Sequence, residues 1–166
     1  CKEHAFIGLK AGTTDKFSLG VINVVTNTAS AYDVTYEIDT TVDFGGVLSG
    51  KIPVHMATAR NVDTPLAFIS YVAFEDRIAY CNGPTGAWTL LATTGPAGGY
   101  TSLHFRNITA TTNPVLYGTA GIAGANKIYT IDITTGAATL IGVGDITTDP
   151  GGFLWPDLMA GATYQN

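Results

Sequence analysis

Charged residues are scarce in this chain. They make up 13% of its 166 residues, against about 25% in a typical soluble protein, and the net charge is −5. The eight lysines and arginines are scattered among thirteen acidic residues, so we expect no binding of nucleic acid. The apolar fraction of 46% is nevertheless high enough for a packed core, which argues against a disordered chain.

Long apolar runs and helical periodicity are also missing. No apolar run approaches the roughly 18 residues that a membrane-spanning helix needs, so we expect no membrane span. Glycine, proline and asparagine interrupt every stretch longer than about ten residues, and no stretch has a 3.6-residue period. The short runs that remain are rich in Ile, Tyr, Thr and Leu. The sequence therefore predicts an all-β fold.

Known catalytic motifs are absent as well. The chain has no nucleophile elbow, no His-Glu-x-x-His, no Cys-x-x-Cys and no phosphate-binding loop. We therefore expect a protein that is not an enzyme, with no catalytic residue and no cofactor apart from a possible calcium ion.

Internal repetition is the most informative feature that is present. Residues 127–142 read KIYTIDITTGAATLIG and match residues 77–92, RIAYCNGPTGAWTLLA, without gaps at an offset of 50. Each copy places a Thr-Gly pair between two extended runs. Gly86 and Gly136 stand where a tight turn needs a positive φ, which glycine reaches at little cost. Upstream of these runs the offset is 49.

The repeats predict one all-β domain over 1–166, made of successive four-stranded units. The units cover about 1–49, 50–97 and 98–147, and 148–166 is the terminal strand of an incomplete fourth unit. In the third unit we expect strands near 101–108, 114–120, 127–133 and 137–143. Four short antiparallel strands in about 50 residues is typical of a propeller blade, and a β-sandwich is the alternative.

The third unit also supports a family resemblance. It contains Leu116-Tyr117-Gly118, then Tyr129-Thr130-Ile131-Asp132, then Thr135-Gly136 followed by Ile141-Gly142. This progression resembles the repeats of secreted, largely uncharacterised bacterial β-propeller proteins. The resemblance is good over 116–142, partial over 64–97 and weak over 1–63. It implies propeller-like blades and an extracellular or cell-surface location, and it brings no catalytic residue.

Three blades and a strand are too few to close a ring. A single-chain propeller usually has four to eight blades, and open edges tend to pair with something. The printed sequence could be part of a longer propeller, or several chains could form one ring. Alternatively, a terminal strand around Phe153, Leu154 and Trp155 completes the sheet of the next subunit and builds a filament.

Low charge, abundant threonine and one acceptor triplet agree with an extracellular address, and the cysteines bear on how the chain is processed. The chain has two cysteines, Cys1 and Cys81, for which we predict a disulfide, and a lipid on Cys1 is the alternative. The sequence starts at Cys1 and not at a methionine, so we expect a processed chain or a fragment. Asn107-Ile108-Thr109 is an acceptor triplet for N-glycosylation, which makes Asn107 a candidate modification site.

The three histidines follow the repeat. His4, His55 and His104 are 51 and 49 residues apart, so we expect them at equivalent positions of successive units. Equivalent positions favour hydrogen-bonded histidines near strand ends over a zinc site made from all three.

Acidic residues cluster in two segments of the chain. Calcium prefers several oxygen ligands, which makes Asp39 and Asp43 in one segment and Asp145 and Asp149 in the other weak calcium candidates. Neither segment matches a calcium-binding loop, and aspartates also serve turns through bonds to the backbone. We favour the turn interpretation.

Aromatic residues are the last functional clue. Side chains of this kind could stack on sugar rings, although in blades they more often belong to the core. The candidates are Trp88, Tyr100, Trp155 and Tyr164.

Two functions of different classes remain. We expect an extracellular structural protein, a subunit of a filament or surface assembly that associates with itself by strand pairing. The alternatives are a carbohydrate-binding propeller with glycan partners, and a fragment of a longer secreted propeller.

Overall fold

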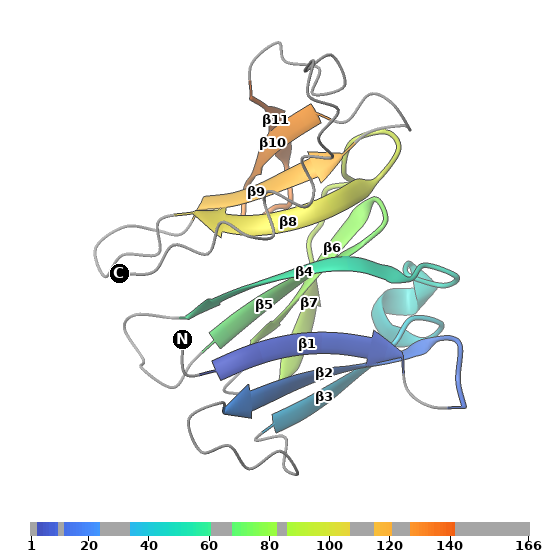
Figure 1. The fold of residues 1–166 in the computed structure, drawn as a ribbon. Helices are drawn as coiled ribbons and strands as arrows, with labels where there is room; N and C mark the ends of the chain where they lie inside the picture. Colours follow the sequence, from blue (N-terminus) through green and yellow to red (C-terminus); the bar gives the residue numbers. More distant parts are fainter. Residues whose placement is uncertain are drawn as a thin grey trace, which may run out of the picture. The chain divides into compact units, whose positions relative to one another are not determined.

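A computed structural model describes residues 3–9, 12–23, 34–60, 68–82, 86–106, 115–120 and 127–141. These residues form three antiparallel sheets and one short 3-10 helix, so the prediction of an all-β fold is confirmed (Figure 1). In this part of the chain no helix is long and apolar enough to cross a membrane. The chain divides into two compact units between Ile52 and Pro53. The single domain over 1–166 stays a prediction.

The first unit contains a three-stranded sheet. Its strands are β1 (Glu3–Leu9), β2 (Lys16–Asn23) and β3 (Val34–Asp39), in that spatial order. Phe17 lies opposite Ile38 in the register, and both are buried, whereas Glu37 beside Ile38 is exposed. The alternation of buried and exposed side chains is the period of two that a strand imposes. A 3-10 helix, Asp43–Gly46, follows the sheet.

The second unit contains two four-stranded sheets, each with its strands in chain order. The second sheet consists of β4 (Pro53–Arg60), β5 (Phe68–Phe74), β6 (Arg77–Asn82) and β7 (Ala87–Leu90). The third consists of β8 (Tyr100–Arg106), β9 (Val115–Ala120), β10 (Lys127–Ile131) and β11 (Ala138–Leu140). The four strands expected in the third unit of the sequence are therefore present within a few residues of their predicted bounds.

The two sheets match each other in register, but at two different offsets. Phe74 and Arg77 close the turn between β5 and β6, and Ala120 and Lys127 are the corresponding pair between β9 and β10. Lys127 follows Arg77 by 50 residues, whereas Ala120 follows Phe74 by only 46. The longer connection after β9 accounts for the difference. The predicted offset of 50 thus holds for the last two strands, while the predicted offset of 49 is wrong for the first two.

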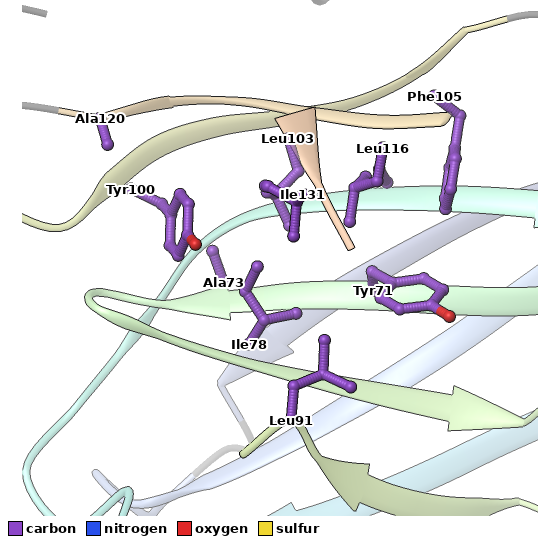
Figure 2. Close-up of a cluster of buried hydrophobic side chains, with 11 residues drawn as sticks. Tyr71, Ala73, Ile78, Leu91, Tyr100, Leu103, Phe105, Leu116, Ala120 and Ile131 are labelled. Carbon is purple, nitrogen blue, oxygen red and sulfur yellow. The ribbon is translucent and has the colours of Figure 1, made fainter. Parts of the chain in front are cut away.

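One apolar cluster joins the second and third sheets. Figure 2 shows side chains from β8, β9 and β10 directed at side chains from β5 and β6. Tyr71 is central, since its ring stacks on Tyr80 at 5.2 Å and makes a T-shaped contact with Phe105 at 5.5 Å between centroids. Its hydroxyl donates to the carbonyl of Ile133 at 3.2 Å. The cluster consists of Ala57, Tyr71, Ala73, Ile78, Leu91, Tyr100, Leu103, Phe105, Leu116, Ala120 and Ile131.

The connection between these sheets also forms backbone hydrogen bonds, here called the clasp, with the turn between β5 and β6. The amide of Gly95 donates to the carbonyl of Asp76 at 2.6 Å, and that of Tyr100 donates to Glu75 at 2.8 Å. A Cβ on Gly95 would overlap Cε2 of Tyr100, so only glycine leaves room for that ring. The clasp fixes the start of the third sheet against the second.

Candidate functional site

The outer edge of the third sheet is the candidate site. Within the described residues β11 has a neighbour, β10, on one side only. It contains no charged residue and no proline, and its register with β10 runs without a bulge. Leu140 is 44% exposed and Ile141, directly after it, is 42% exposed. Natural sheets usually protect such an edge with charges, proline or a bulge, because it can template pairing with another chain.

The inner edges of the two sheets of the second unit carry those protective features. β4 has a bulge between Pro53 and His55, and β8 has one between Tyr100 and Ser102. β4 begins with a proline and ends with Arg60, and β8 ends with Arg106. β4 and β8 also lie side by side in the unit. The inner edges thus carry protective features that β11 lacks, as does β7 at the corresponding edge of the second sheet.

The turn that leads into β11 is held by Asp132. Its Oδ1 accepts hydrogen bonds from the amides of Thr134 at 2.9 Å and Thr135 at 2.7 Å. These bonds from Thr135 and Thr134 lower the pKa of the Asp132 carboxyl below its usual value. The amide of Gly136 donates to the Asp132 carbonyl at 2.8 Å. A side chain placed at the end of β10 therefore sets the direction of the edge strand.

The predicted role of the two turn glycines is confirmed. Gly86 has a φ of 67° and Gly136 a φ of 82°. The Gly86 amide donates to the carbonyl of Asn82 at 2.7 Å, as Gly136 does to Asp132. The turn into β7 and the turn into β11 thus share their backbone bond, although Asn82 replaces the aspartate.

Sequence reasoning missed a copy of the same motif in the first unit. Strand β3 ends in Tyr36-Glu37-Ile38-Asp39, which repeats the Tyr-x-Ile-Asp of β10. Oδ1 of Asp39 accepts from the amide of Thr41 at 3.0 Å, just as Asp132 accepts from the residue two positions on. A search for the short motif would have found it, whereas a search at an offset of 50 could not, because Asp39 precedes Asn82 by only 43 residues.

Two of the four calcium candidates, Asp39 and Asp43, accept hydrogen bonds from backbone amides in this turn of the first unit. Besides Thr41 N, the hydroxyl of Thr41 donates to Asp39 Oδ1 at 2.6 Å, and Lys16 Nζ lies 3.5 Å from Oδ2. The bonds from Thr41 lower the pKa of Asp39. Asp43 Oδ2 accepts the amide of Asp39 at 2.7 Å. Among the described residues no three potential metal ligands come together. Asp145 and Asp149 lie outside the described residues, and calcium binding stays a prediction.

The histidines lie on the first strand of each sheet, but not at equivalent positions. His4 is in β1, His55 is the third residue of β4, and His104 is the fifth residue of β8. Counted from the bulge that opens each strand, His55 corresponds to Ser102. The expected equivalence is therefore wrong for His55 and His104, because the offset between β4 and β8 is 47. His55 is hydrogen-bonded, with Nδ1 3.2 Å from the Leu103 amide.

Cys81 is completely buried in β6, and its thiol forms no disulfide with any described residue. Burial raises the pKa of this thiol to about 12, so it is protonated and behaves as a small apolar side chain. Its predicted disulfide partner, Cys1, lies outside the described residues, so the disulfide stays a prediction.

Two of the four aromatic candidates, Trp88 and Tyr100, lie among the described residues. Tyr100 is 3% exposed and belongs to the core cluster, so its ring has no face open to a sugar. Trp88 in β7 is half-buried. The other predicted site residues lie outside the described residues: Asn107, Phe153, Leu154, Trp155 and Tyr164.

Comparison with known proteins identifies no relative of this chain. No family model, no curated protein and no solved structure matches the chain.

Proposed function

We propose that the chain is a non-catalytic extracellular structural protein whose copies associate by strand pairing at the outer edge of the third sheet. The observation that carries this proposal is the unprotected edge of β11, beside two inner edges that are protected by bulges, proline and arginine. An added strand would gain the backbone hydrogen bonds of the edge and would cover Leu140 and Ile141.

We further propose that the two sheets of the second unit are successive propeller-type blades, related to the secreted bacterial repeats that 116–142 resembles. Three observations support this. Both sheets keep their four strands in chain order, both have a positive-φ glycine before the last strand, and their first strands lie side by side.

The partner in this assembly is a second copy of the chain. From its sequence, the segment around Phe153, Leu154 and Trp155 is the proposed added strand, since it is apolar and follows the last repeat. Head-to-tail addition of this kind forms a ring or an open filament. Because few charges are available, we expect the association to depend little on salt.

The experiment compares lysine substitutions of two apolar residues whose exposed fractions are similar. Leu140→Lys places a charge on the outer edge, while Val54→Lys places one on β4, where the native residue is 40% exposed. The native mass and shape of each protein are measured by light scattering and negative-stain electron microscopy. We expect the wild-type protein and Val54→Lys to form filaments or rings, and Leu140→Lys to remain small.

A second variant tests the proposed added strand. Deletion of residues 153–166 should abolish assembly and leave the circular dichroism of the folded sheets unchanged. A wild-type protein that is a single chain of 17.3 kDa, or a Leu140→Lys variant that assembles normally, would exclude the proposal.

A further inference from the structure

The contact between β4 and β8 includes a hydrogen bond between the His55 side chain and a backbone amide. Nδ1 of His55 lies 3.2 Å from the backbone nitrogen of Leu103 and accepts its hydrogen. β8 has a strand neighbour, β9, on one side only among the described residues, and this amide is satisfied across the gap between the sheets. Leu103 itself is 1% exposed and belongs to the core cluster. The bond thus ties the inner edge of the third sheet to the second sheet at the border of their common core.

The bond requires a neutral imidazole. Nδ1 accepts a hydrogen only through its lone pair, and a protonated imidazole has donors on both nitrogens. Burial lowers the pKa of His55, and the nearby charge of His104 lowers it further, while a backbone hydrogen bond at Met56 acts in the opposite direction.

Apart from that bond at Met56, the surrounding strands supply no negative charge that would stabilise a protonated His55. β4, β5 and β8 contain no aspartate or glutamate. Their other titratable or charged residues are Tyr71 on β5, Tyr100 and His104 on β8, and the terminal arginines Arg60 and Arg106. The two tyrosines belong to the core cluster, and the others add positive charge or none.

We propose that His55 is a pH-sensitive latch between the second and third sheets. In its neutral form it accepts the Leu103 amide and holds the inner edges together. On protonation, Nδ1 carries a hydrogen that faces the Leu103 N–H, so the bond is replaced by a contact between two donors and the edges separate. This inference does not depend on the proposed assembly.

The direction of the effect follows from proton linkage. Above the usual histidine pKa of about 6.5, His55 is neutral in both the folded and the unfolded chain, and the latch is fully present. As the pH falls below that value, the unfolded chain binds a proton that the folded chain resists. Stability is therefore lost on acidification.

The test uses asparagine substitutions at the two histidines of the second unit. His55→Asn keeps an acceptor oxygen near the position of Nδ1 but cannot titrate, and His104→Asn is the matched control. Urea unfolding is measured at about pH 7.5 and about pH 5.5, on either side of the usual histidine pKa. We expect the midpoint of wild type and His104→Asn to fall at the lower pH by more than that of His55→Asn. An equal fall in all three proteins would overturn the proposal.

A second measurement does not depend on how well a variant folds. In the wild-type protein, NMR follows the His55 imidazole and hydrogen exchange of the Leu103 amide through the same pH range. We expect His55 to titrate below 6.5 and the protection of Leu103 to decline in step with it, after correction for intrinsic exchange. Titration at or above 6.5, or a Leu103 protection that does not change with His55, would overturn the latch.

Discussion

The second and third sheets have the same strand order, but they differ in where their large buried side chains lie. At the end of the middle strands, Phe74 in β5 corresponds to Ala120 in β9. At the last buried position of the next strand the order is reversed, and Cys81 in β6 corresponds to Ile131 in β10. All four side chains are at most 4% exposed. Large residues in one sheet thus match small residues in the other.

Gly118 shows that these exchanges are coupled. It occupies the position of Val72, and a Cβ there would lie 2.7 Å from Cδ1 of Ile131. Ile131 therefore fills the space that a side chain at 118 would need. Close packing therefore links the size of the residue at 131 to the absence of a side chain at 118. The comparison shows why two copies of one fold can share few identities in their core strands.

The largest expected effect tests this redistribution at the Cys81 and Ile131 positions. Ile131→Ala should cost about 4 kcal/mol, because it removes a buried side chain and leaves a cavity between the sheets. Cys81→Ala removes a single sulfur and should cost about 1 kcal/mol. The free energy of unfolding from denaturant titration measures both. Equal losses of stability in the two variants would contradict the view that the larger buried side chain at this position belongs to the third sheet.

A smaller effect distinguishes the two turn glycines. Both have a positive φ, so alanine at either should cost about 1 kcal/mol in backbone strain. At Gly136 the new Cβ would also lie 2.9 Å from the Cβ of Leu91, which should raise the total to about 3 kcal/mol. Unfolding of Gly86→Ala and Gly136→Ala under the same conditions checks the difference. A greater loss in Gly86→Ala would contradict it.

The smallest effect concerns Asp132, where the second sheet has Asn82. The folded-state pKa of Asp132 is lowered, so its contribution to stability is present above the ordinary value of 3.8 and is lost as the pH falls through the folded value. Asp132→Asn keeps an acceptor for Thr134 and Thr135 but cannot titrate. We expect a small loss of stability near neutral pH, where the carboxylate contributes, and a shallower loss of stability in acid. A variant with the acid sensitivity of wild type would show that this carboxylate is not stabilised by its turn.

Particular elements show how far sequence reasoning reached. The strands of the third unit and the glycine turns could be predicted because each depends on residues close together in the chain. The register between the units could not, since the four extra residues after β9 leave no mark in a gapless comparison. A gapless comparison therefore predicts that His55 and His104 are equivalent, whereas they are two positions apart along their strands. A comparison at an offset of 50 also does not detect the copy of Tyr-x-Ile-Asp in β3, because its spacing differs.

The candidate site, too, could be predicted from the sequence only in part. The sequence already shows that β11 has no charge and no proline. Which strand forms an edge, and that the inner edges carry bulges, follows only from how the strands pair.

By itself, the sequence determined the all-β class, the repeat and its turns, because period, composition and glycine placement act over a few neighbouring residues. The tertiary structure alone decided which side chains share a core, that Cys81 stands where the next sheet has Ile131, and that His55 reaches Leu103. Those relations join residues about 50 positions apart, and they depend on close packing between sheets, which no local pattern encodes.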